Sequence, residues 1–280
     1  GHRSTAMGTG TTASGDISTA MGTGTTASGT ASTAMGQSTT ASGEYSTAMG
    51  QGTTASDFYS TAMGLSTTAS GASSTAMGQE TTASGQWSTS MGRLTTASSN
   101  QATAMGFETT ASGSVSTAMG TSTTASGDHS TAMGYFTWAR SGYETTIGRY
   151  STVYTPQSTT DWDAADRLFV VGNGTASSSR SDAMVILKNG NTGIGTSIPT
   201  YPLDVSGQIR MRTGATNGYI VQGDANGVMT WVDPSTLGLG GGNTLDEAYD
   251  QGGPGAGRSI NATDGAVAVN GNDGFYITGS

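Results

Sequence analysis

The sequence predicts an all-β fold in which about half of the chain forms a parallel β-roll of 14-residue coils, followed by small all-β fibre modules. The unit S-T-A-M-G-x-x-T-T-A-S-G-x-x begins at Ser4 and recurs every 14 residues through the copy that begins at Ser130. Glycine supplies 45 of the 280 residues and charged residues only 10%. Such a composition is unusual for a globular domain, but a strict period of this kind is typical of stacked repeats that bury their faces against one another.

Each unit divides into two halves, STAMG and TTASG, each followed by two variable residues. Five residues with alternating sides suit a short strand, and glycine with two free residues suits a turn. Two strands and two turns therefore close one flat coil, and a degenerate eleventh copy begins at Glu144. The glycine after each strand is expected to supply backbone angles that other residues resist. Asp57 and Ser99 stand where that glycine is expected, and Ser99 should be the less comfortable of the two in a left-handed turn.

Alternation decides which side chains the coil encloses. Ser4 and Ala6 share one side of the first strand, Thr11 and Ala13 share one side of the second, and all four are small enough for a narrow interior. The methionine column then faces outward. It comprises Met7, Met21, Met35, Met49, Met63, Met77, Met91, Met105, Met119 and Met133, and Ile147 continues it. The alternative is that methionine fills the coil interior while Ser and Ala face outward.

This column predicts self-association. Burying each methionine is worth ~1.5–3 kcal/mol, and no other part of the chain is apolar enough to cover such a face. The same face of other copies, arranged around an axis, is the natural cover. We therefore expect a closed homo-oligomer with the methionine column and Ile147 in its core.

The unit resembles the S-V-A-I-G-x-x-S-x-A-x-G repeat of YadA-type trimeric autotransporter adhesin heads. The resemblance covers about residues 1–157 and includes both half-repeats and both turn glycines; methionine stands where the family usually has Ile or Val. It implies a homotrimer, a trimeric left-handed parallel β-roll, and adhesion to host matrix or other surfaces.

A small all-β module is expected at residues 158–235, with Tyr150, Tyr154 and Trp162 closing the end of the roll. Its strands are predicted at 168–171, 184–188, 191–195, 203–205, 208–212 and 228–232, and Asn189-Gly190 is a strong hairpin signal.

The string K-N-G-N-T-G-I-G-T-S-I-P-T-Y-P-L-D-V-S-G at 188–207 resembles a module of phage tail fibres and related bacterial fibre proteins. Residues 236–243 are interpreted as a Gly-rich linker. Residues 244–280 are interpreted as the start of a further β fibre module, with a helical turn at 244–249.

Composition and motifs disfavour several functions. The net charge is −9 with a single lysine, which argues against a nucleic acid partner, and no apolar stretch is long enough for membrane insertion. Cysteine is absent, and His129 is a variable turn residue without a catalytic constellation around it. We expect no enzyme, no cofactor and no metal. Turn chemistry explains Asp224, Asp264 and Asp273 better than calcium does.

Aromatic residues in the variable turns are the candidates for ligand contact, because turns on a rigid scaffold are where binding usually resides. They are Tyr45, Tyr59, Trp87, Phe107, His129, Tyr135 and Tyr143. The alternative is that they pack in grooves between subunits.

The function expected is that of an extracellular, non-enzymatic trimeric attachment fibre that binds a host-surface glycan or protein receptor. The fibre would be a bacterial surface adhesin, or the tail fibre of a phage or contractile injection system. A purely structural spacer is an alternative. An ice-binding protein, suggested by the outer Thr and Ser lattice that starts at Thr12 and Ser14, is a weaker one.

Overall fold

The computed structural model describes residues 1–210, 212, 214, 219–224 and 228–237. They belong to two compact units, Gly1–Ile209 and a second unit that starts at Arg210.

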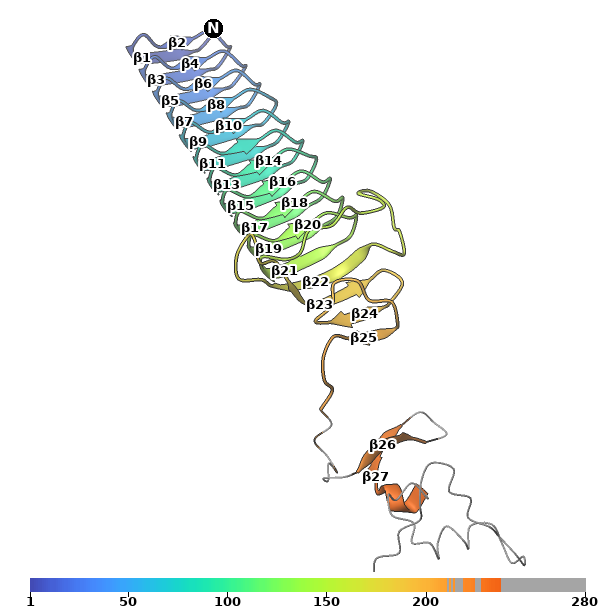
Figure 1. Ribbon diagram of the computed structural model, residues 1–280. Coiled ribbons are helices and arrows are strands. Elements are labelled where there is room, and N and C mark those ends of the chain that lie inside the picture. The colour runs from blue at the N-terminus through green and yellow to red at the C-terminus, as the bar shows by residue number, and fades with distance from the viewer. Residues whose placement is uncertain (211, 213, 215–218, 225–227, 238–280) are drawn as a thin grey trace, which may run out of the picture. The chain divides into compact units, whose positions relative to one another are not determined.

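The first unit is a stack of parallel β coils (Figure 1). Each coil contributes one long and one short strand, and every long strand pairs in parallel with the strand 14 residues away, as Thr5 with Thr19. The long strands are β1 (Thr5–Thr9), β3 (Thr19–Thr23), β5 (Thr33–Gln37), β7 (Thr47–Gln51), β9 (Thr61–Leu65), β11 (Thr75–Gln79), β13 (Thr89–Arg93), β15 (Thr103–Phe107), β17 (Thr117–Thr121), β19 (Thr131–Tyr135) and β21 (Thr145–Arg149). The predicted all-β parallel roll is confirmed.

The short strands form a second sheet of ten strands. They are β2 (Thr12–Ala13), β4 (Thr26–Ala27), β6 (Thr40–Ala41), β8 (Thr54–Ala55), β10 (Thr68–Ala69), β12 (Thr82–Ala83), β14 (Thr96–Ala97), β16 (Thr110–Ala111), β18 (Thr124–Ala125) and β20 (Trp138–Ala139). Each is shorter than the five residues that the TTASG half suggested, because only its second and third residues pair in register with the adjacent coil, as Thr12 with Thr26 and Ala13 with Ala27.

The coil interior holds the four small positions that alternation selects. In the second coil they are Ser18, Ala20, Thr25 and Ala27, which are at most 1% exposed. The methionines alternate with these residues and lie on the outside: Met7 is 59% exposed in the terminal coil, and those from Met21 to Met133 are partly exposed. The alternative that methionine fills the interior is wrong.

Glycine is favoured at its two positions in each coil for different reasons. Gly22 has a φ of +122°, and a Cβ there would also lie 1.9 Å from the carbonyl oxygen of Gly36. Gly29 has no such φ, but a Cβ there would lie 2.0 Å from the oxygen of Gly43. The expectation of a left-handed turn at Asp57 and Ser99 is therefore wrong, since this second column is restricted by the close approach of the next coil.

The roll does not end where the repeat ends. Strand β22 (Arg167–Asn173) adds to β21 in parallel, with Val171 opposite Ile147. Strands β23 (Asp182–Leu187), β24 (Thr192–Ile194) and β25 (Leu203–Val205) continue the same sheet. The expected boundary at residue 157 thus lies inside the first unit, because the long-strand ladder runs unbroken into the segment that was expected to be a separate module.

The hairpin at Asn189-Gly190 and the strand at 203–205 are as predicted. A strand was also expected at 208–212, but the described residues of that range form no strand.

The short-strand sheet ends at β20, and side chains satisfy the backbone N–H groups that a further coil would have satisfied. In an inner coil, Ser28 and Gly29 both donate to the carbonyl of Ala41. In the last coil, the corresponding N–H groups of Arg140 and Ser141 donate to Oε2 of Glu144, at 2.8 and 2.9 Å. A buried carboxylate thus replaces a missing carbonyl, which removes an open sheet edge.

Tyr154 takes part in this closure, as expected, because its hydroxyl donates to the same Oε2 at 3.2 Å. Trp162 does not close the stack in the way that was expected: it is 55% exposed.

The second unit contains, among its described residues, an antiparallel pair of β26 (Ile220–Gly223) and β27 (Met229–Val232), followed by a 3-10 helix, η1 (Pro234–Leu237). The strand predicted at 228–232 is confirmed, whereas β26 and η1 were not predicted. The glycines of the expected linker, the expected helical turn at 244–249 and the rest of 244–280 lie outside the described residues. None of the described helices is long and apolar enough to cross a membrane.

Candidate binding surfaces

The predicted oligomer surface is a continuous apolar strip, here called the methionine ribbon, made of the ten methionines from Met7 to Met133 together with Ile147. Strand register places each methionine directly opposite the next, as in the pairs Met7–Met21 and Met133–Ile147. Val171 extends the ribbon by one more rung. Sequence reasoning missed that rung, although F-V-V-G-N at 169–173 follows the pattern of T-T-I-G-R at 145–149.

The turn aromatics lie along two opposite edges of the roll. The first edge carries Tyr45, Tyr59, Trp87, His129 and Tyr143, each two residues before a long strand, whereas the other candidates, Phe107 and Tyr135, end long strands. The two columns are therefore separated by the length of a long strand, and no single ligand site of small-molecule size can include both.

The backbone at the first edge is left-handed. Tyr45 has a φ of 59°, Trp87 of 57° and Tyr143 of 64°. Non-glycine residues with such angles cost of order 1–3 kcal/mol each, and the cost is tolerated where the surrounding structure fixes the backbone. The backbone preferences of these residues do not suit their turns, so their side chains are what makes them candidates for ligand contact.

Two groups of rings form along the first edge. The rings of Tyr45 and Tyr59 stack with their centroids 5.0 Å apart and their planes 7° apart, and Phe58 joins them at 5.3 Å from Tyr59. The rings of His129 and Tyr143 stack at 5.0 Å and 4°. Trp87 makes no ring contact with a described residue and is 53% exposed.

The second edge has one aromatic group near the end of the roll. The Tyr135 ring meets those of Phe136 and Tyr150 at 4.8 and 5.3 Å. Phe107 lies apart from it, beneath the guanidinium of Arg93 at 5.3 Å. Sequence reasoning missed Phe58 and Phe136 as members of these groups, although each is adjacent in the chain to a candidate that it contacts.

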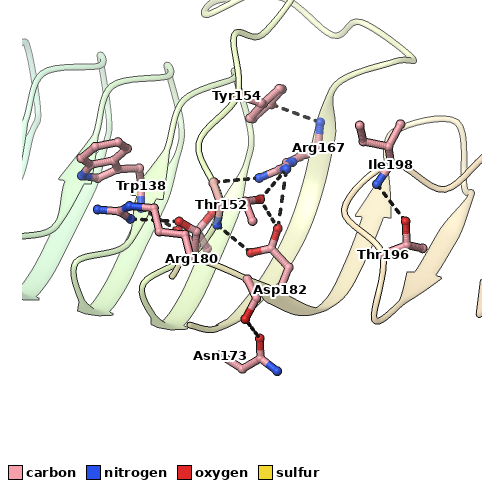
Figure 2. A network of polar contacts seen from close by, with 12 residues as sticks. Trp138, Thr152, Tyr154, Arg167, Asn173, Arg180, Asp182, Thr196 and Ile198 are labelled. Atoms are coloured by element: carbon pink, nitrogen blue, oxygen red, sulfur yellow. Dashed lines mark hydrogen bonds and ion pairs between the residues drawn. The ribbon is translucent and has the colours of Figure 1, made fainter. Parts of the chain in front are cut away.

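The buried charges near the end of the roll have a structural explanation. Arg167 pairs with Asp182 at 3.6 Å, donates to the carbonyl and hydroxyl oxygens of Thr152 at 3.0 and 2.7 Å, and lies over the Tyr154 ring at 4.3 Å (Figure 2). Burial is the main cause that raises the pKa of Glu144, and burial, followed by the charge of Glu144, raises that of the Tyr154 hydroxyl. We call the segment that closes the end of the roll, from Arg140 to Asp182, the cap. Because each of these charges has partners within the cap, the network stabilises the end of the roll.

No three acidic or histidine side chains converge as a metal site would require, within the part of the chain that the structure describes. What the fold presents instead is a rigid stack of identical coils that displays side chains along its faces and edges. This architecture defines a repetitive β-solenoid segment of a fibre.

The comparison with known families agrees with this class. Residues 1–25, 27–53, 55–81, 83–109 and 111–137 each match the YadA head domain repeat, in two copies per segment. The chain thus carries YadA head repeats over residues 1–137, just under half of its length. Repeats of this kind are typical of adhesin-like fibres at the cell surface. No curated protein matches the chain, and the resemblance of residues 188–207 to tail-fibre modules stays a prediction.

Proposed function

We propose that this protein is a non-enzymatic, trimeric attachment fibre, with the methionine ribbon on the trimer axis and the turn aromatics available to a host-surface glycan or protein receptor. The observation that carries the proposal is the ribbon itself, an unbroken column of partly exposed thioethers on a flat sheet face of a YadA-type roll.

Energetics support association through this face. Burial removes apolar surface from water with a gain of roughly 25 cal/mol per Å², and the ribbon runs the whole length of the long-strand sheet of the roll. The opposite outer face carries Thr and Ser, as at Thr68 and Ser70, and has no comparable gain to offer. Association around an axis buries the ribbon of each copy and leaves the hydroxyl face in solvent.

The mass of the purified chain in solution tests this assembly. Light scattering should give three times the chain mass of 27.9 kDa, and Met63→Lys should shift the mass towards one chain because a buried unpaired ammonium is costly. Thr68→Lys is the matched control, because it places the same charge on the outer face of the same coil and should leave the trimer intact. A well-folded monomer with exposed methionines would overturn the proposal.

Adhesion is tested with the labelled full chain on host cells. If the turn aromatics contact the receptor, Trp87→Ser should reduce attachment, and serine is already tolerated at the equivalent Ser73. Deletion of one whole 14-residue coil separates a receptor-binding head from a spacer, because a spacer would keep its attachment and only become shorter.

Two biological settings fit this fibre, a bacterial surface adhesin and the tail fibre of a phage or contractile injection system. Baseplate and sheath genes next to this gene would favour the tail fibre. A membrane-anchor domain encoded on the same chain would favour the adhesin.

A further inference from the structure

The last full coil departs from the repeat on its outer face. In nine coils the outward positions of the short strand are Thr and Ser, from Thr12 and Ser14 to Thr124 and Ser126. In the tenth they are Trp138 and Arg140. This face is opposite the methionine ribbon, so the change has no part in the proposed trimer axis.

A shallow pocket of about 390 Å³ lies at this point, lined by Thr124, Ser126, Trp138, Arg140, Pro156 and Thr159. The segment between β21 and β22 supplies Pro156 and Thr159, while the roll supplies the other four. The volume is within the ~300–1,000 Å³ range of small-ligand sites, and the lining combines flat apolar surfaces with a few polar groups, as such sites do.

Two arginines share the Trp138 ring, and neither has a carboxylate partner among the described residues. The guanidinium carbon of Arg140 lies 4.9 Å from the ring centroid and that of Arg180 lies 4.3 Å from it. Arg140 donates to the carbonyl of Tyr154, and Arg180 donates to the carbonyls of Phe136 and Ser151 (Figure 2 shows Arg180 beside Trp138).

Neither arginine forms an ion pair with any described residue. Two guanidinium groups next to one indole, with no ion pair to the described residues, favour an anionic ligand locally even in a chain of net charge −9.

The remaining lining fits a saccharide. The hydroxyls of Thr124, Ser126 and Thr159 make no hydrogen bond to the described residues, so they are available to sugar hydroxyls. Pro156 and the part of the Trp138 side chain that stays exposed beside the two arginines provide apolar surface for a sugar ring. Arg140 uses one nitrogen for Tyr154, which leaves most of its five donors for a carboxylate, the planar group that a guanidinium binds best.

We infer that this pocket binds a saccharide that carries a carboxylate, with Arg140 on the carboxylate and Trp138 against the ring. The inference builds on the proposed attachment function by naming a ligand class, but the pocket is formed within one chain and does not include the turn aromatics.

The experiment is calorimetry with the full chain and two probes that differ in one acidic residue, sialyllactose and lactose. We expect saturable binding of sialyllactose and at least tenfold weaker binding of lactose. Arg140→Ser and Trp138→Thr should each weaken sialyllactose binding at least tenfold, and both restore residues that nine other coils carry, so the coil should still fold. Thr68→Lys, on the same outer face but five coils away from Trp138, should have no effect on this binding.

Equal affinity for the two probes, or unchanged affinity in Arg140→Ser with the trimer mass retained, would overturn the inference. So would a short polyglutamate peptide that binds as tightly as the sugar, because the pocket would then recognise acidic groups alone. If the parent chain binds sialyllactose but does not attach to host cells, the proposed attachment function is wrong and the pocket stands. If the parent chain attaches to host cells but does not bind sialyllactose, only the pocket inference is wrong.

Discussion

The buried threonines of the roll give a sharp test of how its interior is stabilised. The threonine that opens the TTASG half is 0% exposed in every coil from Thr25 to Thr137. In eight of these coils its hydroxyl has no hydrogen-bond partner among the residues that the structure describes. Thr95 is the exception among them, since its Oγ1 lies 2.7 Å from Oγ of Ser90, which replaces the usual alanine.

The substitution Thr67→Val removes an unpartnered buried hydroxyl and keeps the shape of the side chain. Leaving a buried polar group unsatisfied costs ~1–3 kcal/mol, and valine is at least as favourable as threonine in a strand. We therefore expect Thr67→Val to raise the free energy of unfolding by about 1–2 kcal/mol per chain.

Thr95→Val is the matched control at the equivalent position. It leaves the Ser90 hydroxyl buried without its partner, so we expect a loss of about 1–3 kcal/mol. The double variant Ser90→Ala, Thr95→Val removes both hydroxyls and should recover most of that loss, because replacing both partners by apolar groups is nearly neutral.

Urea unfolding followed by circular dichroism measures all of these variants, at one protein concentration because assembly makes the midpoint depend on concentration. If Thr67→Val lowers the midpoint as much as Thr95→Val does, the unpartnered hydroxyls are not a cost and the reasoning is refuted.

Three further substitutions test the turns and the cap. Gly64→Ala places a Cβ 2.0 Å from the carbonyl oxygen of Gly78 at a φ of +127°; we expect a loss of ~2–5 kcal/mol, and a thermal midpoint within a degree of the parent would contradict this. Burial raises the pKa of Glu144 above its ordinary value of 4.5, so the folded state holds this proton more tightly and stability should decrease as pH rises from that value to the folded-state pKa. Glu144→Gln should lack this decrease in urea midpoints between pH 4 and 8, and an unchanged pH profile would show that other groups cause it. Trp87→Gly should stabilise the roll by up to about 1 kcal/mol, because glycine accepts the left-handed backbone without strain; a clear loss of stability in the same assay would show that this side chain packs against the roll.

The inner coils could be predicted from the sequence because each one has the same neighbours as the next. Once alternation places Ala20 and Thr25 inside, the same answer holds for every coil, and the 14-residue period fixes the register of all the ladders. The reason for the second glycine column could not be predicted in this way. Asp57 and Ser99 show that the column admits exceptions, but the sequence does not show that the limit is a carbonyl of the next coil and not a turn angle.

The end of the roll was less predictable because its contacts occur once. Glu144 departs from the repeat in a visible way, yet nothing in its sequence context shows that the carboxylate turns back to the N–H groups of Arg140 and Ser141. The continuation of the sheet through β22 was missed for a similar reason. The loop between β21 and β22 does not follow the repeat, so its path could not be predicted, and only the similar final residues of the two strands indicate that they pair.

The turns explain how one coil can serve both stability and recognition. The residue two positions before each long strand has a φ between 53° and 64° from Ala31 to Tyr143, whether it is alanine, serine, valine or tryptophan. Stacking between neighbouring coils therefore sets this backbone, and the side chain has little influence on it. Because the backbone here does not depend on the side chain, residues at this position can be substituted without changing the fold. The variation at this position, from Ala31 to Trp87, can therefore be selected for ligand binding. Strand positions such as Ala20 have no such freedom, because their side chains fill the space between the two sheets of the coil.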